Sequence, residues 1–423
     1  MLVKLAYGRK GLTVDFPAGR TTVIEPTYTV GISNQMGAVQ ESIRNPIGTS
    51  PLRSLVRPDQ KVAISVCDIT RPMPRRVVLP VLLQELSHIP TENITLLIAT
   101  GTHRGNSADE RLAMFGREIV EHYQIVNHDA FDRSGLTYLG ESVNVPVWIN
   151  SRWIESDVRI TTGFVEPHFF AGFSGGPKMV APGLAGFDTT MHLHNAKMIA
   201  HPNATWAVTE GNPIHDAVRR IAELSRVDFS VDVTINRDHE LTGVFAGELF
   251  STHRRACATV KNLSMKVVDH PFDIVVTTNS GYPLDQNLYQ TVKGMSAAAQ
   301  IVKEGGAILC ASECSDGIPS HGGYEKVLME GRNPRELLNL ICAPGHNIQD
   351  QWEVQIQAQI QLKADVCLKS DGLTPEQVHA AHLRSISDIG QATKDYIGKF
   401  GPNASVCVLP QGPLTIPYLS TTP

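Results

Sequence analysis

Short runs of apolar residues alternate with amphipathic segments along most of the chain. In the first half, residues 61–67, 93–100 and 157–164 are short and apolar, which predicts buried strands. Residues 77–87 and 108–123 lie between them and carry apolar positions at helical spacing. Alternating strands and helices are typical of parallel sheets covered on both faces, so this half predicts an α/β fold.

The same alternation starts again after a break near residues 260–272. The apolar segments here predict four further strands, at 273–279, 306–312, 365–370 and 404–410. Helical patterns lie between them at 287–306, 335–343 and 374–386. In the last of these helices, Thr374 is expected as the N-cap residue and Pro375 at the first helical position.

The length of the chain, 423 residues, is large for a single hydrophobic core. We therefore predict two α/β domains with mostly parallel sheets flanked by helices, and an active site in the cleft between them. The expected divisions are an N-terminal domain at 1–265 and a C-terminal domain at 266–400. For the C-terminal segment at 401–423, a return to the N-terminal domain is one alternative.

Composition narrows the functional classes. The hydrophobic content of 42% and the charged content of 19% are those of an ordinary globular protein. A net charge of −5 gives no basic surface for nucleic acid, and no apolar run approaches the roughly 18 residues of a membrane span. The first residues alternate like a strand and lack the apolar core of a signal peptide. Seven cysteines, an odd number, indicate reduced thiols and a cytoplasmic protein.

Polar side chains gather where the predicted strands end. The residues concerned are Asp68, Arg71, His103, His168 and Lys178 in the first half, and Tyr289, Gln290 and Lys293 in the second. The carboxyl ends of parallel strands are the edge at which α/β proteins bind ligands. This distribution predicts a functional site, although any α/β protein has loops at this edge.

The glycine-rich segment "GFSGGPK" contains one lysine, Lys178. Apolar surroundings lower the pKa of a lysine, which favours a nucleophile or a covalent attachment point, whereas a solvated surface charge is the simpler alternative. Pro177 and Met179 flank the lysine and rule out a P-loop. The segment also fits G-x-S-x-G with Ser174, but the prolines that follow disfavour the helix that a hydrolase nucleophile elbow requires.

Three other groups suggest chemistry. His103 and His168 lie at strand ends, as general bases on two sides of a substrate would. His192 or His194 has the chemistry of a metal ligand, although the zinc-protease motif is missing. Arg71 is suited to bind a carboxylate, and a local ion pair with Asp68 is equally compatible. Finally, Tyr289, Gln290 and Lys293 share one face near a helix N-terminus, which favours an anion or is simply solvated.

Seven features occur in a fixed order along the chain: "DITRP", "GTHR", "EPHFFAGFSGGPK", "MHLHN", "EGNP", "LDQNLYQTVKG" and Trp352. In order and spacing they resemble the lactate racemase family, and the resemblance covers nearly the whole chain. That family uses a nickel-pincer nucleotide, the nickel complex of pyridinium-3,5-bisthiocarboxylic acid mononucleotide. The nucleotide is attached to a lysine and binds Ni through sulfur, carbon and sulfur.

The resemblance implies a role for each motif residue. Lys178 would be the covalent tether and His194 the protein ligand to nickel, with His192 as a neighbouring competitor. His103 and His168 would be the paired acid/base residues, and Arg71 and Lys293 would hold the substrate carboxylate. The remaining contacts implied are to the cofactor, by Asp68, Tyr289, Gln290 and Gly176, and to the substrate pocket, by Trp352 and Gln290.

The resemblance implies a racemase or epimerase that inverts C2 of a 2-hydroxy acid by reversible hydride transfer. The substrate would be lactate or a larger hydroxy acid, including an aldonic acid such as gluconate; Asn279, Ser280 and Asn287 mildly favour a polyhydroxylated one. The implied partners are this small molecule and the host's cofactor-synthesis enzymes, with no nucleic acid or membrane, and a homo-oligomer stays open. The alternatives are a non-catalytic homologue that binds the nickel nucleotide and a zinc hydrolase.

Overall fold

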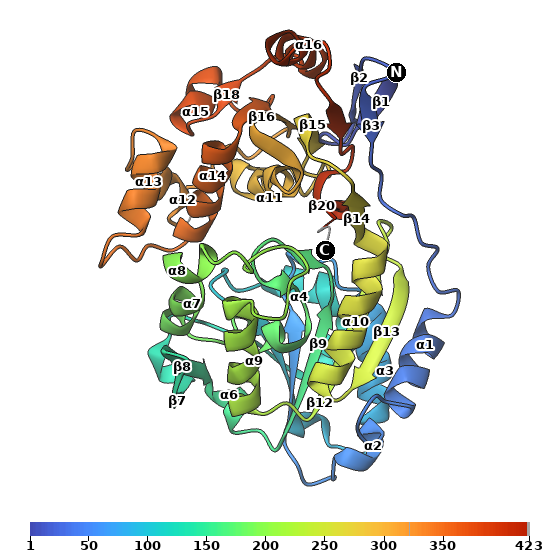
Figure 1. Cartoon of the computed structure of the whole chain (residues 1–423). Helices are drawn as coiled ribbons and strands as arrows, with labels where there is room; N and C mark the ends of the chain where they lie inside the picture. Colours follow the sequence, from blue (N-terminus) through green and yellow to red (C-terminus); the bar gives the residue numbers. More distant parts are fainter. Residues whose placement is uncertain (321, 421–423) are drawn as a thin grey trace. The chain divides into compact units, whose positions relative to one another are not determined.

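The computed structural model describes residues 1–320 and 322–420, which form two compact units (Figure 1). Unit 1 contains Met1–Thr27, Asn195–Ala200 and the chain from Leu263 onwards, and unit 2 contains Tyr28–His194 and His201–Asn262. The first 27 residues therefore belong with the C-terminal half, which corrects the expected N-terminal domain at 1–265. The segment from residue 401 to 420 also stays in unit 1 and does not return to the other unit.

Unit 2 is built on a six-stranded sheet with the order β13-β12-β9-β4-β5-β6. Its strands are β4 (Val62–Cys67), β5 (Ile94–Ala99), β6 (Gln124–Asn127), β9 (Val158–Phe164), β12 (Phe229–Ile235) and β13 (Leu241–Gly247). All neighbours are parallel except β12 and β13. Every residue of β4 is buried, which explains its unbroken apolar sequence. The three strands predicted in this half are confirmed.

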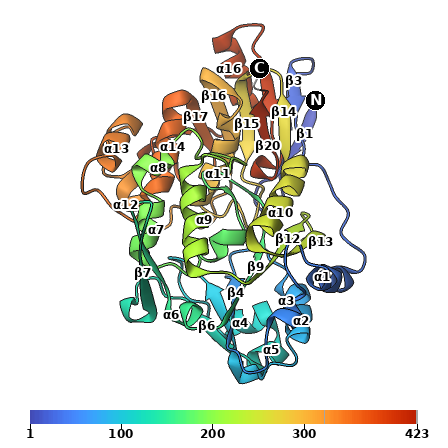
Figure 2. The same ribbon diagram turned by 60° about the horizontal axis from the view of Figure 1, so that its bottom comes forward.

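Helices cover both faces of this sheet. Figure 2 shows α9 and α10 on one side and α3, α4 and α5 on the other. The helices of unit 2 are α1 (Gln35–Arg44), α2 (Leu52–Leu55), α3 (Arg75–Glu85), α4 (Ala108–Phe115), α5 (Arg117–His122), α6 (Ser151–Ile154), α7 (Phe187–Leu193), α9 (Pro213–Ser225) and α10 (Leu249–Ser264, whose last residues pass into unit 1). A hairpin of β7 (Leu136–Ser142) and β8 (Val145–Asn150) and a short one of β10 (Pro167–His168) and β11 (Gly172–Phe173) complete the unit.

The single helix predicted at 108–123 is wrong in one respect, because Gly116 divides it into α4 and α5. Gly116 has a φ of 83°, in the left-handed region that glycine adopts without strain. Its N–H still donates to Leu112 O, so the residue ends α4 as a C-cap, and it is also the N-cap of α5.

Unit 1 contains a second six-stranded sheet, with the order β18-β17-β16-β15-β19-β3 and all neighbours parallel. Its strands are β3 (Thr21–Val23), β15 (Phe272–Thr278), β16 (Val302–Ala311), β17 (Asp365–Lys369), β18 (Arg384–Ser385) and β19 (Val406–Val408). The four strands predicted in this half are confirmed. The pairing of β3 with β19 places the N-terminal residues in this unit.

The rest of unit 1 covers this sheet or extends it. The hairpin of β1 (Leu2–Leu5) and β2 (Leu12–Asp15) shares a hydrophobic core with α16, and β14 (Met265–Val268) pairs with β20 (Ile416–Leu419). The helices are α8 (Ala196–Ile199), α11 (Leu288–Ala299), α12 (Tyr324–Leu328), α13 (Pro334–Ile341), α14 (Gln351–Lys363), α15 (Pro375–Ala380) and α16 (Ile389–Phe400). None of the helices in the described ranges has the length and apolarity needed to cross a membrane.

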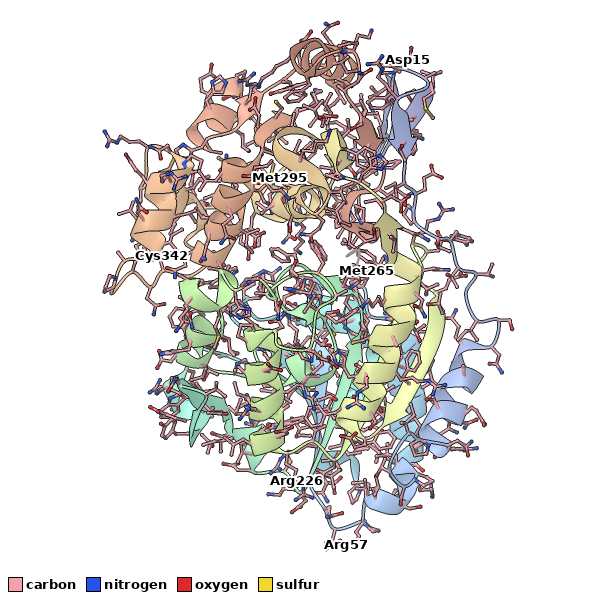
Figure 3. The ribbon with its side chains drawn as sticks, in the orientation of Figure 1. Asp15, Arg57, Arg226, Met265, Met295 and Cys342 are labelled. Carbon is pink, nitrogen blue, oxygen red and sulfur yellow. The ribbon has the colours of Figure 1, made fainter. Side chains whose placement is uncertain are left out.

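Two helix predictions in unit 1 have clear outcomes. Thr374 is confirmed as the N-cap of α15: it accepts from the backbone N–H of Gln377, and Pro375 is the first helical residue. The helix predicted at 287–306 ends early, at Ala299, because the chain from Val302 already pairs with β15. Met295 lies within α11 and is fully buried (Figure 3).

All seven cysteines are free thiols, as predicted. Six are buried, and Cys342, at the end of α13, is exposed (Figure 3).

Candidate active site

The carboxyl ends of β4 and β5 bring Asp68 and His103 into contact. Asp68 directly follows β4, and its Oδ2 accepts a hydrogen bond from Nδ1 of His103 at 2.8 Å. The Asp68 side chain is 4% exposed and that of His103 is 49% exposed. Burial by itself would raise the pKa of Asp68, but the hydrogen bond from His103 and the positive charge of Arg71 outweigh it and lower the pKa. The carboxylate is therefore ionised at neutral pH and holds the imidazole with the proton on Nδ1.

A second arginine, absent from the predicted site, shapes this loop. Arg75 is 8% exposed and donates to the carbonyl oxygens of Cys67 at 3.0 Å, Arg71 at 2.9 Å, and Asp68. It lies on α3 in register with the buried residues Val78 and Leu82. The sequence contained a signal for this buried role, because Arg75 lies on the apolar face of its helix whereas its neighbour Arg76 does not.

Lys178 lies in a short 3-10 helix, η3 (Gly176–Met179), which follows the small β10–β11 hairpin. Ser174 braces the hairpin: its Oγ donates to Phe164 O and accepts from the backbone N–H of Glu166, both at 2.9 Å. The Ser174 hydroxyl therefore both donates to and accepts from the backbone. The segment that follows it is the short 3-10 helix η3 and not the α-helix that a hydrolase nucleophile elbow requires. The carbonyl of Lys178 accepts from Gly183 N at 3.2 Å.

The loop of His103 is joined to the lysine segment through the backbone. Gly101 N donates to Gly183 O at 3.0 Å, and on the neighbouring strand Ser65 Oγ donates to Met179 O at 2.7 Å. The parallel pairing of β4 with β5 and β9 places their carboxyl ends at one edge of the unit 2 sheet, as the sequence predicted, and these contacts attach the segment after Lys178 to it.

Phe170 lies at the centre of the second group of predicted residues. The rings of His168 and His194 meet it edge to face, with centroid distances of 4.4 and 5.2 Å. The ammonium of Lys178 is 5.8 Å from the centroid of the same ring. The structure thus gathers His168, Lys178 and His194 around one aromatic side chain, which the sequence analysis did not single out.

The two competing metal-ligand candidates differ in burial. His192 is exposed, whereas His194 is 7% exposed and donates from Nδ1 to Thr190 O at 2.7 Å. Burial lowers the pKa of His194 to about 4; the hydrogen bond to Thr190 opposes this and the charge of Lys178 adds to it. His194 is therefore neutral at pH 7 with its lone pair on Nε2, the form of imidazole that binds a transition metal. The geometry favours His194 over His192.

The predicted residues of unit 1 lie on two helices that pack together. Asn287 caps α11 by accepting from Gln290 N at 3.0 Å, and Lys293 Nζ donates to Gln290 Oε1 at 2.8 Å. On α14, Trp352 donates from Nε1 to the hydroxyl of Tyr289 at 3.3 Å. The structure therefore brings together Tyr289, Gln290, Lys293 and Trp352.

Glu353, the residue after Trp352, was not predicted. It is fully buried, and no hydrogen-bond partner for its carboxyl oxygens is present among the described residues. Burial raises its pKa to about 8, while the charge of Lys293 lowers it and that of Asp350 raises it.

The polar residues that favoured a polyhydroxylated substrate are used by the chain itself. Asn279 donates to Leu284 O, Ser280 donates to Gln411 O at 2.5 Å, and Asn287 is the cap of α11. The donor groups of Asn279 and Ser280 and the side-chain oxygen of Asn287 are therefore bonded within the chain.

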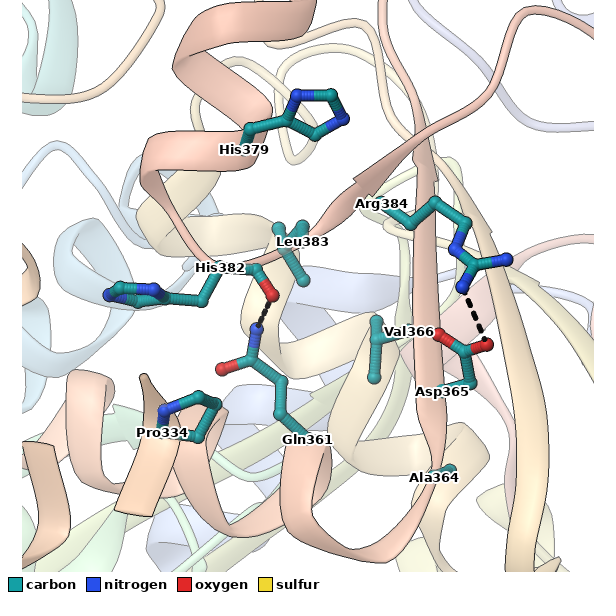
Figure 4. A pocket seen from close by; sticks show the side chains of 9 residues that line it. All are labelled: Pro334, Gln361, Ala364, Asp365, Val366, His379, His382, Leu383 and Arg384. Carbon is teal, nitrogen blue, oxygen red and sulfur yellow. Dashed lines mark hydrogen bonds and ion pairs between the residues drawn. The ribbon is translucent and has the colours of Figure 1, made fainter. Parts of the chain in front are cut away.

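A pocket of about 370 Å³ lies elsewhere in unit 1, beside β17, α15 and β18 (Figure 4). Two of its lining residues, Arg384 and Asp365, form an ion pair at 3.5 Å, and Gln361 donates to His382 O at 2.7 Å. No predicted site residue lines it. Across residues 1–320 and 322–420, no group of three His, Cys, Asp or Glu side chains is arranged to hold a metal ion.

Comparison with known proteins gives the family of the chain. Residues 7–207 match the model of the lactate racemase N-terminal domain, and residues 267–416 match that of the lactate racemase C-terminal domain. The chain belongs to the lactate racemase family. It is an isomerase, a racemase, and the resemblance read from its motifs is confirmed.

Individual relatives span almost the whole chain. A lactate racemase of Thermoanaerobacterium thermosaccharolyticum is 36% identical over 420 residues, covering 97% of each chain. A lactate racemase of Lactiplantibacillus plantarum is 35% identical over 419 residues, covering 97% of this chain and 98% of the relative. The structure of the lactate racemase apoprotein from T. thermosaccharolyticum matches with a TM-score of 0.92 at 34% identity, covering 99% of this chain and all of that one. A Thermotoga maritima protein, 18% identical with a TM-score of 0.71 over 93% of this chain and all of that one, shares the fold.

Proposed function

We propose that this racemase inverts C2 of a short 2-hydroxy acid, lactate or a close analogue, by reversible hydride transfer to a nickel-pincer nucleotide attached to Lys178. The observation that carries the proposal is the pair of predicted acid/base residues in unit 2. His103 is oriented by a buried carboxylate, and His168 lies with Lys178 and His194 around Phe170. The names of the relatives support lactate as the first substrate to test.

His103 is the base in this proposal. Because Asp68 accepts from Nδ1, the neutral ring has its lone pair on Nε2. Nε2 takes the hydroxyl proton of one enantiomer, and the ionised carboxylate then stabilises the imidazolium that forms. The role proposed for Asp68 is therefore to orient His103, in addition to the cofactor contact that the motif implies.

His168 serves the opposite enantiomer and starts from a different tautomer. Its Nδ1 accepts from the backbone N–H of Ala171 at 3.3 Å, so the neutral ring carries its proton on Nε2. In that form it donates a hydrogen bond to the substrate oxygen. To take a proton through Nε2, the ring must first change tautomer and give up the hydrogen bond from Ala171.

The residues present fit the implied cofactor. Lys178 is partly buried among Phe, Gly and Pro, and His194 is a neutral, buried imidazole whose Nδ1–H is anchored. Lys178 would hold the nucleotide and His194 would bind the nickel. When bound, the group supplies the acceptor for the hydride from C2. Arg71 would bind the substrate carboxylate and keep C2 oriented.

The experiment is to express the chain with cofactor-synthesis enzymes and to measure intact mass, nickel content and the racemisation of enantiopure 2-hydroxy acids. We expect a nucleotide-sized adduct on Lys178, about one nickel per chain, and turnover of lactate. His194→Ala and His192→Ala form a matched pair: the first should lose the nickel, and the second should keep it.

The same preparation separates the alternatives. His103→Ala should keep the adduct and lose turnover, whereas a non-catalytic nucleotide-binding homologue would show no turnover to lose. An unmodified Lys178 despite competent cofactor synthesis contradicts the proposal. Stoichiometric zinc together with ester hydrolysis would establish the zinc hydrolase instead.

A further inference from the structure

A buried polar cluster lies beneath the segment that carries Lys178. It consists of Asp232 on β12, His253 and Cys257 on α10, and His215 on α9, all less than 8% exposed. None of these residues has a part in the chemistry proposed above. A carboxylate on a strand as buried as β12 is costly unless it has a specific partner.

Two members of the cluster bond directly to the backbone before Lys178. Oδ1 of Asp232 accepts from Gly176 N at 2.9 Å, and Nε2 of His253 lies 2.9 Å from Ser174 O. A carbonyl oxygen only accepts, so Nε2 of His253 is the donor. The backbone at Gly176 and Ser174, two and four residues before Lys178, is therefore held by side chains that are 56 and 79 residues away in the sequence.

The two glycines of this segment, Gly175 and Gly176, pack closely against Asp232 and His253. Gly176 has a φ of 49°, and a Cβ there would lie 2.4 Å from Cγ of His253. Gly175 has a φ of 73°, and its Cβ would meet Cγ2 of Val165 at 2.8 Å and Oδ1 of Asp232 at 3.1 Å. The glycines thus allow the backbone to rest on Asp232 and His253. Gly176, predicted to contact the cofactor, has its N–H committed to Asp232.

Burial acts on the pKa of both members of the pair. Burial raises the pKa of Asp232 against the opposing effects of His253 and the Gly176 N–H. Burial lowers the pKa of His253 against the opposing effects of Asp232 and Ser174. The contact with the loop is the hydrogen bond that Oδ1 accepts from Gly176 N, and the amide oxygen of asparagine can accept the same bond.

We propose that Asp232 and His253 are positioning residues for the tether: they fix the backbone at Ser174 and Gly176 and so direct the amine of Lys178 toward the group that it binds. This inference rests on the proposed function in that the group is the nickel nucleotide. Neither side chain touches the cofactor; both act through the backbone of the loop.

The test compares Asp232→Ala, Asp232→Asn and His253→Leu with Ser230→Ala, which removes a buried polar group from the same strand. Ser230 bonds to Thr161 and not to the loop. The first readout is the rate at which Lys178 gains the nucleotide adduct, followed by intact mass. We expect Asp232→Ala and His253→Leu to load at least tenfold more slowly, and Asp232→Asn and Ser230→Ala to stay within about threefold of wild type.

The second readout needs no cofactor. Limited acetylation of the apoprotein with acetic anhydride forms an amide at a lysine and releases acetate. Peptide mass spectrometry then gives the ratio of acetylation at Lys178 to that at the exposed Lys197. In Asp232→Ala and His253→Leu this ratio should move toward one, because a Lys178 whose backbone is no longer held should react more like the exposed Lys197. His253→Gln, which keeps an N–H donor, should lie closer to wild type than His253→Leu. This pair of His253 variants decides the test if Asp232→Ala does not fold.

Wild-type loading and wild-type acetylation in both Asp232→Ala and His253→Leu would overturn the proposal, as would equal slowing in Ser230→Ala. If wild-type Lys178 gains no adduct while the acetylation ratio still changes in the variants, the cofactor assignment fails and the positioning role stands.

Discussion

Replacing Asp68 by asparagine tests the orientation of His103. The hydrogen bond between Oδ2 and Nδ1 is 2.8 Å long, and its acceptor is a buried, ionised carboxylate. A hydrogen bond to a charged group contributes about 1.5–3 kcal/mol, and each 1.4 kcal/mol is a factor of ten in rate. An asparagine amide can also donate to Nδ1, which would leave the proton on Nε2 and block the base. We therefore expect kcat to fall about 10- to 100-fold.

The same variant has a defined effect on stability against pH. The pKa of Asp68 is lowered in the folded protein, so the carboxylate contributes stability above its ordinary pKa of 3.8. That contribution is lost as the pH falls through the lower folded value. The free energies of unfolding of wild type and Asp68→Asn should differ at neutral pH and approach each other in acid.

The assay is racemisation of enantiopure lactate by protein whose adduct and nickel content have been measured. Thr70→Ala is the control, because Thr70 donates to the other carboxyl oxygen, Oδ1, at 2.7 Å and leaves the bond to His103 in place. It should change kcat less than threefold. If Asp68→Asn, fully loaded with nickel nucleotide, keeps more than half of the wild-type kcat, Asp68 does not orient the base.

Three further predictions concern stability, each measured by urea unfolding. Gly176→Ala should destabilise by about 2–4 kcal/mol, because Gly176 has a positive φ and the imidazole of His253 occupies the place of a Cβ. Gly398→Ala, at an open position inside α16, is the control and should be neutral or stabilise by up to about 1 kcal/mol. Equal effects of the two substitutions would contradict this packing. Arg75→Leu removes the buried donor to the carbonyl oxygens of Cys67, Asp68 and Arg71 and should cost about 3 kcal/mol or more. The exposed Arg76→Leu is the control and should cost less than about 1 kcal/mol. Burial raises the pKa of Glu353 to about 8, so the free energy of unfolding of the wild type should fall by on the order of 4 kcal/mol as pH rises from 4.5 to 8. Glu353→Gln should show no such fall. Parallel curves of unfolding free energy against pH for the two proteins would refute the raised pKa.

Much of the fold followed from local patterns. The unbroken apolar run of β4 and the start of α15 at Thr374 and Pro375 are determined by burial on both faces and by capping chemistry within a few residues. The edge that carries the site was predictable for the same reason, since parallel strands place their carboxyl ends together. The roles of Lys178 and His194 came from the resemblance to a family and not from these patterns.

The sequence by itself determined seven strands of the two sheets, which loops carry polar residues, and which family the motifs resemble. Only the tertiary structure decided that β3 pairs with β19, that Asp68 meets His103, and that Asp232 and His253 support the backbone before Lys178. Periodicity reports which side of an element faces the core. The partner of a buried polar group is chosen only when distant strands take their places in the sheet, and no local pattern carries that information.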